Sequence, residues 1–114
     1  MIEKVVLDWL NDQLNVPCYM EEKENMPASY VLIEKTGASE ENLIWDATFA
    51  LQSYAETLYM AAELNEQVKE AMDHIIELDV ITRSKLNSDY NYTDTARKKY
   101  RYQAVYDLKH YEEA

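Results

Sequence analysis

The chain has 114 residues, 22 of them acidic and 11 basic, with a formal net charge of −11 at pH 7. This length predicts one domain over residues 1–114, and the acidic excess disfavours generic binding to nucleic-acid phosphates, which requires positive charge. Cys18 is the lone cysteine and the apolar N-terminus is interrupted by charges, so we expect no internal disulfide, signal peptide or membrane span, and a reducing compartment.

The N-terminal third predicts one helix and two strands. Residues 2–14 form the helix, because apolar side chains recur there at helical spacing. A short strand is expected at residues 16–20. Residues 29–36 are rich in β-branched and aromatic side chains, which predicts a strand ending at Gly37, where we expect a positive φ angle. Residues 38–42 are then interpreted as a polar loop.

The middle of the chain predicts a strand followed by a long helix. Residues 43–53 alternate between apolar and polar side chains, which is typical of a half-buried strand. Residues 54–76 contain no glycine or proline, and their apolar side chains recur three and four positions apart. That apolar stripe consists of Leu58, Ala61, Ala62, Val68, Ala71, Met72 and Ile75. The opposite face of the helix is mainly acidic.

The C-terminal third predicts a β-hairpin. Residues 80–92 and 100–110 each alternate between two faces, and the polar residues 93–99 link them. Arms of this length should curl strongly or project past a body of this size. The whole pattern predicts an α+β fold: a mostly antiparallel sheet with a long and a short helix packed on one face. The other face is polar, so it must meet water or a neighbouring molecule.

Two groups of side chains have the residue types of a reactive site. Cys18 with His74 or His110 is a conceivable nucleophile and base, and Glu70, His74 and Glu77 share one helical face as conceivable metal ligands. A small buried thiol and a solvated helix end explain these residues more simply. We therefore expect a protein that is not an enzyme, with no catalytic, metal or cofactor site.

Charge is distributed unevenly along the chain. Residues 1–79 hold 17 acidic and 4 basic side chains (4 − 17 = −13), whereas residues 80–114 hold 7 basic and 5 acidic side chains (7 − 5 = +2). Basic and tyrosine side chains alternate near the hairpin link, which is typical of phosphate-binding patches. With the overall charge negative, a solubilising tip or a protein partner is favoured there. The asymmetry predicts head-to-tail pairing between copies of the chain.

Several segments together resemble one protein family. They are Pro27 with the strand Tyr-Val-Leu-Ile-Glu-Lys-Thr-Gly (30–37), Ala-Thr-Phe-Ala-Leu-Gln-Ser-Tyr-Ala (47–55), the helix with Ala61, Ala62 and Val68, and Ser-Asp-Tyr-Asn-Tyr-Thr-Asp (88–94) with Arg101, Tyr102 and Val105. In this order they look like the tail terminator proteins of long-tailed bacteriophages and prophages, also called tail completion or head-tail joining proteins.

The resemblance implies a structural protein of virion assembly. It would form an oligomeric ring, typically of six copies, at the head-proximal end of the tail tube, where it stops tube polymerisation and gives the head connector a docking surface. Its partners would be itself, the tail tube protein and the head connector or neck protein, with no membrane, and with DNA only passing through the ring. It would occur in the host cytoplasm during assembly and then in the virion tail.

A ring of this kind needs two complementary patches on each subunit. The acidic helix with its flanking loop and the basic hairpin are the candidates for the subunit or partner interface. They comprise Glu40, Glu41, Glu56, Glu63, Glu66, Arg83, Lys85, Arg97, Lys98, Lys99 and Arg101. Three other interpretations stay open: an acidic DNA-mimicking or inhibitory protein-binding module, another phage neck or connector protein, and an enzyme with a pocket around Cys18.

Overall fold

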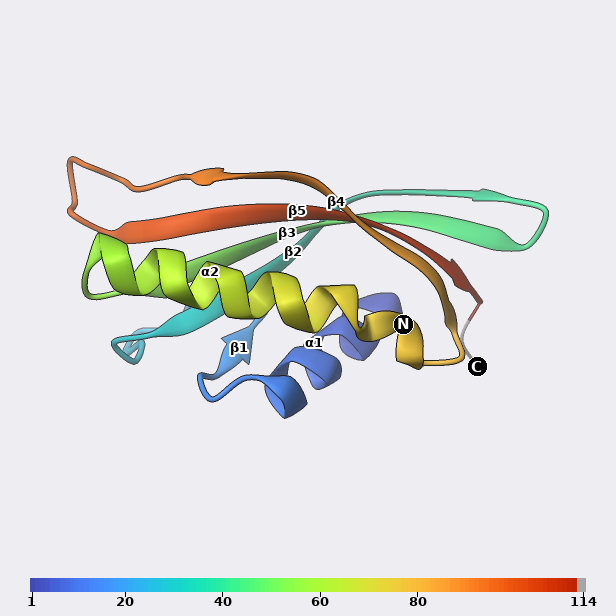
Figure 1. Ribbon diagram of the computed structural model, residues 1–114, viewed down its shortest axis with the longest axis horizontal. Helices are drawn as coiled ribbons and strands as arrows, with labels where there is room; N and C mark the ends of the chain where they lie inside the picture. Colours follow the sequence, from blue (N-terminus) through green and yellow to red (C-terminus); the bar gives the residue numbers. More distant parts are fainter. Residues whose placement is uncertain (113–114) are drawn as a thin grey trace.

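The computed structural model describes residues 1–112, which form an α+β fold as the sequence predicts (Figure 1). Five strands form one sheet in the order β1-β2-β3-β5-β4, with β1 parallel to β2 and the other neighbours antiparallel. The elements are α1 (Ile2–Gln13), β1 (Cys18–Tyr19), β2 (Tyr30–Glu41), β3 (Ile44–Ala55), α2 (Leu58–Asp73), the 3₁₀ turn η1 (Ile75–Glu77), β4 (Ile81–Asn91) and β5 (Tyr100–Tyr111).

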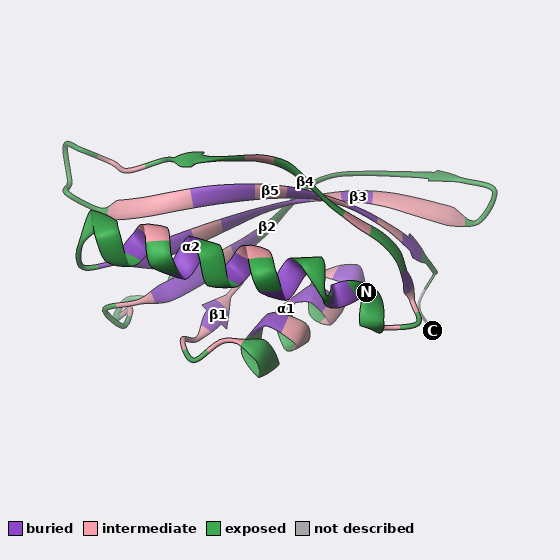
Figure 2. Ribbon diagram, viewed as in Figure 1, coloured by how far each residue is buried: buried purple, intermediate pink, exposed green. Residues whose placement is uncertain are grey.

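Both helices pack on one face of the sheet and bury it (Figure 2). Every second side chain of the strands points toward the helices and forms one side of the core, and one apolar stripe of each helix forms the other side. Phe49 on β3 lies directly opposite Tyr106 on β5, and both are buried. The core also contains Val6, Leu10, Ile33, Leu51, Val68, Met72 and Leu108. The alternation predicted for β3 is confirmed.

Helix α2 begins later than the sequence predicts. Tyr54 and Ala55 still belong to β3, where they pair with β5. Thr57 is the N-cap, and its hydroxyl accepts a hydrogen bond of 3.1 Å from the Met60 N–H. Since the helix starts after this cap, Leu58 falls outside the buried stripe and is 39% exposed. Leu64 and Asn65, which the predicted stripe omitted, are buried.

Strand β2 does not stop at Gly37. A β-bulge between Lys35 and Gly37 shifts the register, and the strand then continues to Glu41, paired with β3 throughout. Gly37 does not have a positive φ angle. The predicted loop at residues 38–42 and the predicted role of the glycine are therefore both wrong. In this hairpin, positive φ angles occur in the turn that follows, at residues 42–43; Lys98, in the turn between β4 and β5, also has one.

The alternation predicted for β4 is also wrong. Register shifts lie between Ile81 and Arg83 and between Leu86 and Ser88. Each shift inserts one extra residue, so the side chains that follow it point to the opposite face of the sheet from the one that strict alternation predicts. As a result Leu86 and Asp89 share the helix-covered face, opposite Tyr106 and Ala104. The bulges accompany a strong curvature of β4 over the sheet, visible in Figure 1.

The two hairpins point in opposite directions along an elongated body of 44 × 24 × 23 Å (Figure 1). The turn between β2 and β3 projects past the helices at one end. The turn between β4 and β5 lies at the other end, next to the start of α2. The predicted hairpin of β4 and β5 therefore curls, and the hairpin of β2 and β3 is the one that projects past the helices. Among residues 1–112, no helix is long and apolar enough to cross a membrane.

Candidate interaction surfaces

The face of the sheet that carries no helix, called the open face below, is covered by cross-strand hydrogen bonds between polar side chains. Residues opposite each other in register share a face. The Thr48 hydroxyl donates to Asp107 (2.9 Å), and the Gln52 amide donates to Gln103 (2.8 Å). The Gln103 amide donates in turn to the Tyr90 hydroxyl on β4. These polar groups therefore satisfy one another, while Leu32, Ala50 and Val105 lie between them on the same face.

Aromatic rings and one cation cover the end of the open face nearest the turn of β4 and β5. The rings of Tyr30 and Tyr54 stack at 4.6 Å between centroids. The Arg101 guanidinium donates to the Tyr54 hydroxyl (2.7 Å) and to the Tyr92 carbonyl (2.6 Å), and lies 4.4 Å from the Tyr92 ring centroid. Arg101, a predicted interface residue, is therefore already engaged within its own chain.

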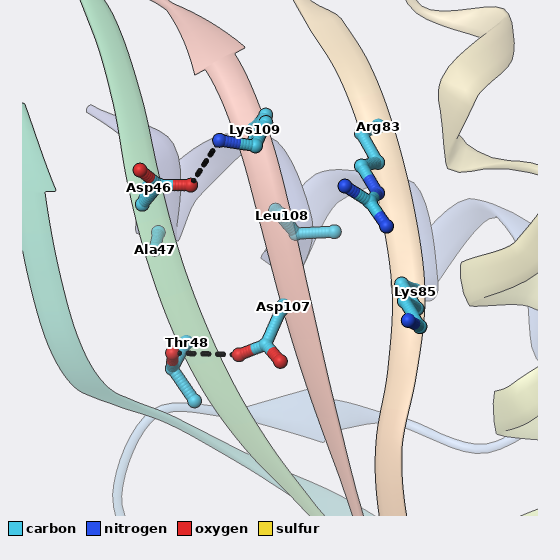
Figure 3. A pocket seen from close by; sticks show the side chains of 8 residues that line it. All are labelled: Asp46, Ala47, Thr48, Arg83, Lys85, Asp107, Leu108 and Lys109. Carbon is cyan, nitrogen blue, oxygen red and sulfur yellow. Dashed lines mark hydrogen bonds and ion pairs between the residues drawn. The ribbon is translucent and has the colours of Figure 1, made fainter. Parts of the chain in front are cut away.

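A hollow of about 300 Å³ lies across β3, β5 and β4 near the other end of the sheet (Figure 3). Lys109 reaches Asp46 across it at 3.0 Å. Arg83 and Lys85 line its β4 side and make no ion pair with residues 1–112. Because the Asp107 carboxylate already accepts hydrogen bonds from Thr48 and Asn87, the two β4 cations are available to an acidic group from outside.

The turn between β2 and β3 forms an acidic tip, defined as residues 40–43. Glu40 and Glu41 are exposed, and the Glu40 carboxylate accepts a hydrogen bond of 2.9 Å from the Leu43 N–H. Leu43 itself is 74% exposed. Glu40 and Glu41 were predicted on a loop flanking the acidic helix, but they lie at the end of the body opposite the start of α2 (Figure 1).

The turn between β4 and β5 forms a basic tip, defined as residues 94–99. Asp94 and Lys99 close the turn with two backbone hydrogen bonds of 3.1 Å. Lys99 also lies 3.6 Å from Glu22 of the same chain, and Arg97 lies 3.8 Å from Asp94. Lys98 makes no ion pair within residues 1–112, so it is the cation of the basic tip that is most available to a partner.

Helix α2 presents two chemically different surfaces. Its outer side is acidic, with Glu63 and Glu66 exposed, and Lys69 bridges Glu66 (3.0 Å) and Asp89 (2.6 Å). The hydrogen bond to Asp89 is the main cause that raises the pKa of Lys69. The first turn is apolar: Leu58, Tyr59 and Met60 are all exposed, and we call them the α2 patch. Glu56 lies just before this patch, in a groove shared with Lys98 and Lys99.

The structure does not bring Cys18 and His110 together. Across the sheet, Cys18 pairs with Val31, Val31 with Ser53, and Ser53 with Tyr102 on β5. His110 lies eight residues farther along β5 than Tyr102. At about 3.4 Å per residue, this offset is roughly 27 Å along the strand. Cys18 is 5% exposed, and burial raises the pKa of its thiol to about 12. His74 is exposed near Glu77, at 3.8 Å.

Glu70, His74 and Glu77, which the sequence offered as conceivable metal ligands, do not form a metal-binding group. Among residues 1–112, no three His, Cys, Asp or Glu side chains are placed to hold one ion. Glu70 and His74 instead line a shallow hollow beside the end of α1.

The predicted interface residues fall into separate groups rather than two continuous patches. The acidic members divide between the acidic tip and the region of α2, and the basic members divide between the hollow on the open face and the basic tip. Sequence reasoning missed Leu43 and the α2 patch. Asn42 before Leu43 and Thr57 before the patch were the available signals, since asparagine favours a left-handed turn and threonine favours an N-cap.

No protein-family model matches this chain, and no curated protein matches it significantly.

Proposed function

We propose that the chain is a structural subunit that assembles head to tail into a closed ring, and that the ring is the tail terminator of a long-tailed bacteriophage or prophage. One observation carries the assembly part of the proposal. The acidic tip and the basic tip lie at opposite ends of a body 44 Å long, so each copy has two unlike ends. A closed ring requires such unlike ends, because its contacts are heterologous.

The open face supports the same proposal. Its polar side chains satisfy one another by hydrogen bonds across the strands, with Thr48, Gln52 and Gln103 as examples. A face of this kind is stable against water, so it suits the wall of a solvated channel or an outer surface. The hollow with Arg83 and Lys85 adds a second place where an acidic neighbour can dock. The phage role itself rests on the resemblance of the sequence segments.

Electron microscopy of the purified protein, alone and mixed with the tail tube protein of the same phage or prophage, tests the proposal. Closed rings that cap tube ends and limit tube length are expected. A ring that binds the connector but ignores tubes would assign the chain to another neck component. A monomer that binds a single basic protein would favour the DNA-mimicking alternative, which the acidic outer side of α2 also fits.

Charge reversal at the basic tip tests the contact more directly. Lys98→Glu is preferable to a change at Lys99, because Lys99 also faces Glu22 of its own chain. We expect the variant to associate roughly tenfold more slowly at low salt, with a smaller difference at high salt, because tip charges mainly set orientation and association rate. Lys98→Arg, which keeps the positive charge at the same position, is the matched control and should associate like the wild type. Equal effects of both variants would contradict a specific role for the basic tip.

A further inference from the structure

The turn at the acidic tip holds an apolar side chain in an unfavourable backbone conformation. Asn42 and Leu43 have φ angles of 54° and 68°. Positive φ at both central residues is the pattern of a type I′ turn, for which Asn-Gly is the preferred sequence. Asparagine tolerates this region, whereas a leucine there is energetically costly because its Cβ crowds the backbone. With Leu43 74% exposed, little contact within its own chain offsets that cost.

The backbone of Leu43 is nevertheless held in place by contacts on both sides of the turn. Its N–H donates to Glu40, and Glu41 pairs with Ile44 on the other side of the turn. The turn therefore projects the apolar side chain of Leu43, called the Leu43 knob below, from a constrained backbone that also carries the Glu40 and Glu41 carboxylates. Fixing a contact residue before binding lowers the entropy lost on association.

The α2 patch at the opposite end of the body has the complementary chemistry. Tyr59 is 77% exposed, and Leu58 and Met60 beside it are exposed as well. Tyrosine is enriched among the residues that dominate binding energy at interfaces. A patch of three consecutive exposed apolar residues at a helix start therefore has the composition of a contact surface.

The charge around the α2 patch suits an acidic partner. The N-terminus of α2 carries the positive end of the helix dipole, and its first turn contains no acidic residue. The basic tip lies alongside, because Ala55 pairs with Tyr100 and Lys98 lines the same groove as Glu56. Glu22, Lys23, Glu24 and Lys99 line this groove as well, and Lys99 already lies 3.6 Å from Glu22. Lys98, which has no such partner among residues 1–112, and the helix N-terminus are the positive groups next to the apolar patch that an acidic partner can reach.

The acidic tip and the α2 patch cannot meet within one chain, because they lie at opposite ends of the 44 Å axis. We infer that the Leu43 knob of one copy docks on the α2 patch of the next copy, with Glu40 and Glu41 directed at Lys98 and the helix N-terminus. This inference rests on the proposed ring, and it identifies the residues that make the contact. A contact between unlike surfaces repeats from copy to copy, and it forms a ring where the rotation between neighbours closes.

Two variants, studied alone and mixed, test the docking by sedimentation velocity. Leu43→Gly removes the knob and also relieves the unfavourable backbone angle, so thermal stability should be unchanged or slightly higher. Tyr59→Ala removes the anchor of the patch. Each variant alone should associate at least tenfold more weakly than the wild type. An equimolar mixture should form heterodimers, because the knob of one variant still fits the intact patch of the other.

Ile76→Ala is the matched control, since Ile76 is exposed near the far end of α2 and lies outside the contact. If the wild type forms rings and both variants do so equally well, the docking is overturned while the proposed ring stands. If the wild type assembles but the equimolar mixture of the two variants contains only monomers, the docking is overturned as well. If the wild type neither forms rings nor caps tail tubes, the proposed function fails and the docking fails with it.

Discussion

Tyr106 on β5 donates a hydrogen bond of 2.8 Å from its phenol to the Asp73 carboxylate at the last residue of α2. The same phenol lies 3.1 Å from the Lys69 carbonyl oxygen. The ring of Tyr106 is buried in the core, opposite Phe49. One side chain therefore connects the middle of the sheet to the C-terminal half of the long helix.

Replacing Tyr106 by phenylalanine should lower the free energy of unfolding by about 1 kcal/mol, because one buried hydroxyl loses its hydrogen bonds while the ring keeps its packing. The melting temperature should fall by about 4 °C for a domain of this size. Urea denaturation and calorimetry measure both quantities. Tyr111→Phe, at an exposed position, is the control and should change neither. An unchanged midpoint for Tyr106→Phe would show that its phenol contributes nothing.

Stability should fall at alkaline pH. Burial raises the pKa of Tyr30 and of Tyr106, and the hydrogen bond to Asp89 raises the pKa of Lys69. A raised pKa in the folded state means that the stabilisation is complete below the unfolded pKa, near 10 for these groups, and is lost as the pH rises through the folded value. Urea midpoints measured from pH 7 to pH 11 should decline above about pH 10. The decline should be smaller in Tyr106→Phe, and a flat profile would contradict the assignment.

Gly37→Ala should stabilise the fold. Gly37 does not have a positive φ angle, and a Cβ added there meets no atom within 4 Å. Alanine restricts the unfolded chain more than glycine does, so the free energy of unfolding should rise by about 0.5 kcal/mol. Chemical denaturation detects a change of this size. A loss of stability would instead show that the bulge after Lys35 needs a glycine conformation.

Thr57→Ala should lower the free energy of unfolding by about 1 kcal/mol, because the Met60 N–H loses its side-chain acceptor at the start of α2. Thermal melts followed by circular dichroism measure this loss. Thr95→Ala, an exposed position in the basic tip, is the matched control and should have little effect. Loss of equal size in both variants would point to an effect unrelated to capping.

The parts of the fold that follow from burial could be predicted from the sequence. The alternation around Phe49 identified β3 because one face of that strand is covered and the other is not. The residues at which strands and helices begin and end were harder to predict. No glycine or proline separates β3 from α2, so the predicted helix absorbed Tyr54 and Ala55. The strand end predicted at Gly37 was wrong because glycine occurs at β-bulges as well as at turns.

The interaction surfaces could be predicted only in part. The charges of Glu41 and Lys98 are visible in the sequence, but their separation at opposite ends depends on the strand order, which places β5 between β3 and β4. The hydrogen bond from Gln52 to Gln103 joins residues 51 positions apart, so it depends on a cross-strand register that no local pattern encodes. No local pattern encodes the bulges in β4 either, so the shared face of Leu86 and Asp89 could not be predicted from alternation.

The burial of Cys18 has a practical consequence. A thiol that is 5% exposed, with its pKa raised to about 12, stays protonated and shielded at neutral pH. A cysteine introduced on the surface, for example in place of Leu43 or Tyr59, would therefore react with maleimide dyes or crosslinkers far faster than the native thiol. Fluorescent labelling of the two ends can proceed without first replacing the native residue.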